Sequence, residues 1–201
     1  MHKQSLKKIV AIGPESTGKS TLCEQLALRY NTSWCPEYAR EYLLQHGTNY
    51  SYDNLFTIAK GQLAMEDEYE LSMGNEQWAI TNDQTSESHS PFTIHHSPVL
   101  FIDTDMYVMK VWCEFVFGKC HKWILEQIVE RKYDLYLLCS TDLPWVKDEL
   151  REYPDLVTRE KLFRIYKDLI INQDTPWVIV EGDTKTRLQI AVNAVNKLLN
   201  S

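Results

Sequence analysis

The sequence lacks any apolar run close to the roughly 20 residues that a membrane-spanning helix needs, and residues 1–8 lack the apolar core of a signal peptide. Its 5 cysteines are scattered and form no C-x-x-C pair, so neither a zinc site nor a disulfide framework is indicated. Basic residues are in the minority, with 21 Lys and Arg against 28 Asp and Glu and a net charge of −7, which argues against general affinity for nucleic acid or anionic membranes. We therefore expect a cytoplasmic protein with reduced thiols and without a nucleic-acid or membrane partner.

The segment with the clearest chemical signature is residues 13–20 (GPESTGKS), which match the phosphate-binding pattern G-x-x-x-x-G-K-[ST] at every fixed position. An apolar run precedes it, as a buried strand would, and apolar residues at helical spacing follow it. The two glycines allow backbone turns in which successive N–H groups point at phosphate oxygens. The helix expected after the loop adds the positive end of its dipole at the same place. The segment predicts binding of a nucleoside triphosphate with Mg²⁺ through Gly13, Glu15, Ser16, Thr17, Gly18, Lys19, Ser20 and Thr21.

Four further apolar runs predict strands that alternate with helices along the rest of the chain. The strands are expected at residues 8–12, 31–36, 99–103, 133–139 and 177–181, and Asp142 is expected to begin a helix as its N-cap. This alternation implies a single α/β domain over residues 1–201, a three-layer fold whose five-stranded parallel sheet carries helices on both faces. Ligands of such sheets lie beyond the carboxyl ends of the strands.

Two other stretches depart from a regular pattern. Residues 74–98 break the helical periodicity and predict a loop insertion, whose His89, His95 and His96 have no recognised ligand spacing and are expected to be solvated. In the helix expected from Asp53, Gln62 lies on the apolar side, where an amide needs a hydrogen-bond partner.

Carboxylates at the strand ends supply candidates for metal binding and proton transfer. Asp103 ends an apolar strand and is expected to hold Mg²⁺ with Ser20, since this ion prefers oxygen ligands. Glu37 and Asp105 are candidates for the general base or for binding a sugar hydroxyl, and the sequence leaves open which acid removes the proton. A solvated ion-pair face with Arg40 is the other interpretation of Glu37.

Arginines after the fourth predicted strand indicate a lid over the triphosphate, here called the lid segment (about residues 142–160). Cations there would neutralise charge on the transferring group. We expect Arg151 to act in catalysis with Lys19, Asp103 and Glu37, and Arg159 to contact ATP.

Together these residues resemble the nicotinamide riboside kinase (ribosylnicotinamide kinase) domain of NadR-type proteins, which are phosphate-loop kinases of the P-loop NTPase superfamily. The similar segments are residues 13–21 (GPESTGKST), 37–42 (EYAREY), 60–62 (KGQ), 101–105 (FIDTD), 142–146 (DLPWV) and 148–151 (DELR). The resemblance implies transfer of the ATP γ-phosphate to the ribose 5′-hydroxyl of nicotinamide riboside, giving nicotinamide mononucleotide for NAD synthesis. It also implies that the riboside pocket includes Glu37, Tyr38, Arg40, Gln62, Asp105 and Trp145, with Trp34 as a further stacking surface.

The chain departs from this family at Glu149, where a glycine is expected, and in the length of residues 74–98. Many relatives are fused to a nicotinamide mononucleotide adenylyltransferase whose histidine motif has no counterpart here, so the kinase activity alone is predicted. Two alternatives stay open: a kinase for another nucleoside or small alcohol, and a regulatory ATPase.

Overall fold

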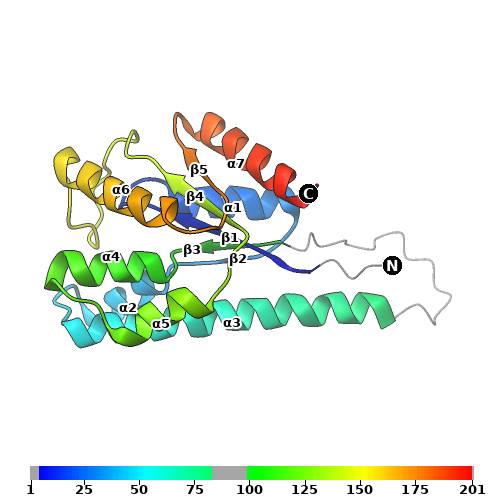
Figure 1. Cartoon of the computed structure of the whole chain (residues 1–201), viewed down its shortest axis with the longest axis horizontal. Helices are drawn as coiled ribbons and strands as arrows, with labels where there is room; N and C mark the ends of the chain where they lie inside the picture. The colour runs from blue at the N-terminus through cyan, green and yellow to red at the C-terminus, as the bar shows by residue number, and fades with distance from the viewer. Residues whose placement is uncertain (1–4, 83–98, 201) are drawn as a thin grey trace.

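A five-stranded parallel sheet in the order β2-β3-β1-β4-β5 lies at the centre of the molecule (Figure 1). The computed structural model describes residues 5–82 and 99–200, with side chains described in 5–73 and 99–200. The strands are β1 (Lys7–Ile12), β2 (Trp34–Cys35), β3 (Val99–Asp103), β4 (Leu135–Cys139) and β5 (Trp177–Val180). All pairings are parallel, which confirms the sheet that the sequence predicts.

Helices cover both faces because successive strand residues point to opposite sides. Ile9 and Ala11 of β1 pack in one core with side chains of α1 and α7, whereas Val10 and Ile12 pack in a second core with side chains of α4 and α6. A third core joins α2, α3, α4 and α5. The helices are α1 (Lys19–Tyr30), α2 (Tyr38–His46), α3 (Tyr52–Asn82), α4 (Met106–Phe117), α5 (Lys122–Glu130), α6 (Leu156–Ile171) and α7 (Thr184–Leu199).

Parallel pairing brings the carboxyl ends of the strands to one edge of the sheet. Ala11 pairs with Asp103 in β3, and Ile12 pairs with Leu138 in β4, so the loops that follow β1, β3 and β4 begin side by side. The phosphate-binding segment, Asp103 and the lid segment therefore meet at the same edge, as the sequence predicts.

The predicted helix beginning at Asp142 is wrong. The chain has no regular structure from residue 140 to 155, and α6 begins only at Leu156. Asp142 instead accepts a hydrogen bond of 2.5 Å from the N–H of Gly182 and pairs with Arg187 of α7. Because the Asp142 carboxylate makes these long-range contacts, it does not cap a local helix.

The predicted loop insertion at residues 74–98 is wrong over its first part, because α3 continues through residues 74–82. The remainder of that segment, with its three histidines, lies outside the described residues. In the described ranges, no helix is long and apolar enough to cross a bilayer.

Candidate functional site

The phosphate-binding loop joins β1 to α1 and needs glycine at both of its fixed positions. Gly13 has φ +140°, and a Cβ at this position would lie 2.7 Å from the carbonyl oxygen of Cys139 in β4. Gly18 has φ +75° and forms the N-cap of α1. Ser16 also has a positive φ, 56°, a conformation rare outside glycine and found where surrounding contacts enforce it.

Two side chains of the loop itself and two arginines from α6 and α7 hold the loop's carbonyl groups. The Pro14 carbonyl accepts from the Thr17 hydroxyl at 2.7 Å and from Lys19 Nζ at 3.0 Å. The Ser16 carbonyl accepts from Arg159 at 3.2 Å, and that of Thr17 from Arg187 at 3.0 Å. Carbonyls that already accept these hydrogen bonds leave the N–H groups of the loop to serve a bound anion.

Both of these arginines are buried. Arg159 was expected to contact ATP from the lid segment, but it lies beneath the loop and outside the residues that line the cleft. Arg187 was missed in the sequence. Its signal was a position four residues before Ala191 on the buried face of α7, where a charged side chain requires partners. Arg187 donates hydrogen bonds to the carbonyls of Ser140 and Gly182 and forms an ion pair with Asp142.

Asp103 faces the first turn of α1. Its Oδ2 accepts a hydrogen bond of 2.5 Å from the Ser20 hydroxyl, and its Oδ1 is buried with no hydrogen-bond partner among the described residues. Burial raises the pKa of the Asp103 carboxyl, while the nearby Lys19 acts in the opposite direction. An unpaired carboxylate oxygen next to a hydroxyl is a donor set that Mg²⁺ accepts, so the two residues fit the predicted metal site.

Glu37 occupies the turn between β2 and α2, on the same side of the cleft as Asp103. Thr104, with φ 81°, directs its hydroxyl to Glu37 at 3.5 Å. Burial raises the pKa of the Glu37 carboxyl, and the neighbouring Asp103 charge raises it further. A carboxyl with a raised pKa accepts a proton more readily, which is what a general base requires.

Gln62 has the partners that its buried position requires, which confirms that prediction. Its amide accepts from the N–H of Tyr38 at 2.8 Å and donates to the carbonyls of Pro36 at 3.2 Å and Asp103 at 3.5 Å. Gln62 thus joins the turn that carries Glu37 to the end of β3. The Tyr38 ring packs over Gly61, where a Cβ would lie 2.1 Å from the ring.

Asp105 serves as the N-cap of α4. Its carboxylate accepts from the N–H groups of Tyr107 and Val108 at 3.0 and 3.3 Å and from the Tyr136 hydroxyl at 2.9 Å. Burial raises the pKa of Asp105 to about 7, against these three hydrogen bonds. The Asp105 side chain therefore fixes the start of α4, two residues after Asp103.

The lid segment is fastened to the phosphate-binding loop and to α2. Glu15 accepts from the indole N–H of Trp145 at 3.2 Å, and Ser16 Oγ accepts from Arg151 at 3.3 Å. At the other side, Arg40 of α2 forms an ion pair of 3.0 Å with Asp148. The backbone N–H of Arg151 donates to the carbonyl of Asp148 at 3.2 Å, so the two contacts lie in the same turn of the lid segment.

These elements enclose a cleft of about 470 Å³. Of the predicted site residues it brings together Gly13, Glu15, Ser16, Thr17, Gly18, Lys19, Ser20, Thr21, Glu37, Arg40, Asp103 and Arg151, together with Trp34. Those that do not line it are Tyr38, Gln62, Asp105, Trp145 and Arg159. Four aromatic side chains also line the cleft: Trp112, Phe115, Tyr153 and Tyr166.

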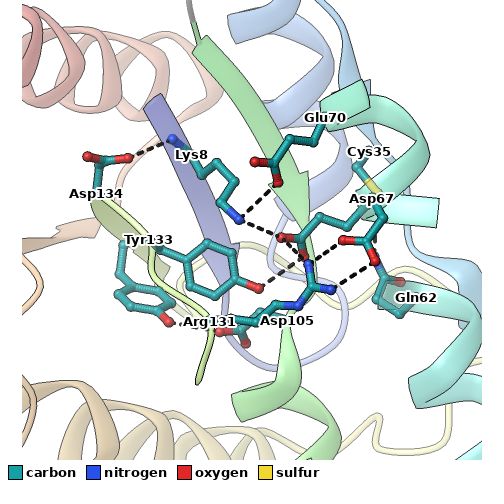
Figure 2. A network of polar contacts seen from close by, with 11 residues as sticks. Lys8, Cys35, Gln62, Asp67, Glu70, Asp105, Arg131, Tyr133 and Asp134 are labelled. Carbon is teal, nitrogen blue, oxygen red and sulfur yellow. Dashed lines mark hydrogen bonds and ion pairs between the residues drawn. The ribbon is translucent and has the colours of Figure 1, made fainter. Parts of the chain in front are cut away.

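A buried polar network supports α3 from the opposite end of the sheet (Figure 2). Glu66 is fully buried and contacts Lys8 at 3.2 Å, Arg131 at 3.3 Å and the Tyr133 hydroxyl at 3.0 Å. Glu66 lies one helical turn beyond Gln62, whose amide holds the turn after β2 and the end of β3. This network was not predictable from the sequence, because a glutamate in a helix usually faces water.

A parallel sheet with a phosphate-binding loop between β1 and α1 defines a P-loop protein. A family model described as an AAA domain matches residues 8–187, and the chain belongs to this family. Among curated proteins, it is 26% identical over 198 residues to the "Trifunctional NAD biosynthesis/regulator protein NadR" of Salmonella typhimurium and to that of Escherichia coli. The match covers 96% of this chain and 43% of each relative, so the chain spans less than half of their length.

Solved structures share the same fold. NadR protein in complex with NR superposes with a TM-score of 0.67 at 20% identity, over 97% of this chain and 50% of that one. Thymidylate kinase from Ehrlichia chaffeensis gives a TM-score of 0.53 at 11% identity over 97% and 100% of the two chains. Deoxyadenosine kinase from M. mycoides gives 0.51 at 17% identity over 94% and 99%.

Proposed function

We propose that this protein transfers the γ-phosphate of ATP to the ribose 5′-hydroxyl of nicotinamide riboside, giving nicotinamide mononucleotide for NAD biosynthesis. The observation that carries the proposal is the placement of Asp103 and Glu37 in one cleft with Lys19 and Ser20. A kinase needs a phosphate-binding element and carboxylates facing an acceptor hydroxyl, and this cleft supplies both.

The comparisons favour nicotinamide riboside as the acceptor. The chain aligns over nearly its full length with part of NadR, and the similar structure is that of NadR with NR bound. The aromatic side chains that line the cleft suit a flat ring, and the carboxylate of Asp148 suits a cationic one.

Each polar residue then has a defined task. Lys19 and the loop N–H groups bind the β- and γ-phosphates, and Ser20 with Asp103 holds Mg²⁺. When bound, Mg²⁺ neutralises charge on the phosphate oxygens. Glu37, whose pKa is raised by burial and by Asp103, accepts the proton of the 5′-hydroxyl. Arg151 stabilises charge on the transferring group.

The remaining predicted residues act without contacting the substrates. Tyr38, Gln62 and Asp105 shape the pocket wall by fixing the turn after β2 and the start of α4. Arg159 holds the phosphate-binding loop from behind, and Trp145 holds the lid segment.

A kinase acting on another nucleoside is the second candidate, since the chain shares its fold with deoxyadenosine and thymidylate kinases. Incubation of the purified protein with ATP, Mg²⁺ and a panel of nucleosides separates the possibilities. Release of ADP with nicotinamide riboside above all others supports the proposal. Preference for a deoxynucleoside supports the second candidate, and slow hydrolysis that ignores every acceptor indicates a regulatory ATPase.

A further inference from the structure

An acidic side chain at the third position of an anion-binding loop calls for an explanation. Glu15 would repel a bound triphosphate if its carboxylate pointed at the phosphates, because like charges at short range destabilise each other. In the structure the carboxylate is turned toward the lid segment. Its Oε1 accepts from the indole N–H of Trp145 at 3.2 Å and from the backbone N–H of Tyr153 at 2.6 Å, and its Oε2 accepts from the N–H of Glu152 at 2.9 Å.

Three N–H groups on one carboxylate make a strong attachment, since hydrogen bonds to an ionised acceptor are stronger than those between neutral groups. Two of the three donors belong to the backbone, so they fix the path of the lid segment and do not depend on the identity of the lid side chains.

The next residue of the loop extends the attachment to the arginine. Ser16 Oγ accepts from the backbone N–H of Val146 at 3.0 Å and from the guanidinium of Arg151 at 3.3 Å. The guanidinium also donates to the carbonyl of Val146 at 2.6 Å. Arg151 therefore lies against the phosphate-binding loop, within the part of the lid segment that Glu15 fastens on both sides, at Trp145 and at residues 152–153.

We propose that Glu15 is a positioning residue, which holds the lid segment against the phosphate-binding loop and thereby places Arg151 for phosphoryl transfer. The proposal rests on the proposed kinase function, because Arg151 has a group to act on only when a phosphoryl group is transferred. This attachment preorganises the site, because Arg151 is already in position and does not have to be ordered from a free loop in each catalytic cycle.

The first test is amide hydrogen exchange, followed by mass spectrometry on peptides that cover residues 145–155, without nucleotide or nucleoside. In Glu15→Ala the amides of Glu152 and Tyr153 lose their acceptor, and we expect them to exchange at least about tenfold faster than in the wild type. Glu149→Ala is the matched control, because Glu149 is an exposed carboxylate of the same segment that makes none of these bonds. Equal exchange in the wild type and Glu15→Ala would overturn the proposal.

The second test is a double-mutant cycle on kcat with Glu15→Ala, Arg151→Ala and the double variant. If Glu15 acts through Arg151, the double variant is no slower than Arg151→Ala alone, and Glu15→Ala lowers kcat by on the order of 10- to 100-fold. The KM for ATP stays within about threefold, since Lys19 and the loop backbone remain. Additive losses, or a loss confined to KM, would mean that Glu15 does not work through the arginine.

A folding defect is distinguished by Glu15→Gln, which keeps one acceptor oxygen and the side-chain volume. Exchange and kcat between those of the wild type and Glu15→Ala, at an unchanged melting temperature, support positioning. If Glu15→Gln matches the wild type in both, the carboxylate is not the attachment.

The two proposals fail separately. Hydrogen exchange is measured without substrates, so its result holds whatever the acceptor is. If the protein phosphorylates a different nucleoside, or hydrolyses ATP alone, the proposed function falls, and the cycle is run on that reaction with the same criterion of non-additivity.

Discussion

The hydroxyl of Ser20, in the first turn of α1, donates a hydrogen bond of 2.5 Å to Oδ2 of Asp103 at the end of β3. The two residues are 83 positions apart in the chain, and the parallel pairing of β1 with β3 brings them together. The second carboxylate oxygen is buried and has no hydrogen-bond partner among the described residues. This pair joins the phosphate-binding motif to the strand-end acid, the relationship on which the proposed metal site depends.

The first prediction concerns Asp103→Asn. The amide keeps the shape of the side chain but removes the charge, so we expect turnover to fall by at least about 100-fold at saturating ATP and Mg²⁺. The melting temperature should change little, because the amide oxygen still accepts from Ser20. Near-normal turnover in a folded variant would remove Asp103 from the mechanism.

The second prediction concerns Gly61→Ala in the interior of α3. Alanine normally stabilises a helix relative to glycine by about 1 kcal/mol. Here the new Cβ would lie 2.1 Å from the Tyr38 ring, so we expect a loss of about 1–3 kcal/mol in the free energy of unfolding, measured by urea denaturation.

The sign of the Gly61→Ala effect decides the interpretation. In a Tyr38→Ala background the clash is absent, and the same substitution should become neutral or stabilising. A stabilising effect in the wild-type background would show that the ring does not pack against the glycine.

The third prediction concerns the buried network. Glu66→Ala leaves Lys8 and Arg131 without their shared carboxylate in a buried environment, so we expect a loss of about 3–5 kcal/mol of stability. Asp67→Ala, one residue further along, removes an acid whose side chain is 52% exposed and which also pairs with Arg131. This control should cost less than about 1 kcal/mol. Equal losses in the two variants, by urea or thermal unfolding, would contradict the assigned role of Glu66.

Features set by local sequence were predictable. The loop at residues 13–20 was predictable from its glycines, its lysine and the flanking apolar pattern. That Gln62 has hydrogen-bond partners was also predictable, because an unpaired amide on an apolar helix face is costly. The strands followed from apolar runs, and the meeting of their carboxyl ends at one edge followed from the alternation of strands and helices.

Features set by distant contacts were not predictable. Asp142 carried a local capping signal, but its carboxylate is used by Gly182 and Arg187 from the other end of the chain. Trp112 and Phe115 border the cleft because α4 packs beside it, which no local motif in the sequence indicates. Arg159 was assigned to ATP by its place in the lid segment, whereas the structure buries it behind the phosphate-binding loop.

The most direct test of the central claim is phosphorus NMR of the reaction products of ATP, Mg²⁺ and nicotinamide riboside, with the wild type and Lys19→Ala compared at equal concentration. Lys122→Ala, a substitution of a lysine whose side chain is 90% exposed, serves as the control. The account predicts a 5′-phosphomonoester of the riboside and ADP with the wild type and the control, and neither product with Lys19→Ala. Absence of the phosphomonoester with folded wild-type protein, or its formation by Lys19→Ala at the wild-type rate, would contradict the account.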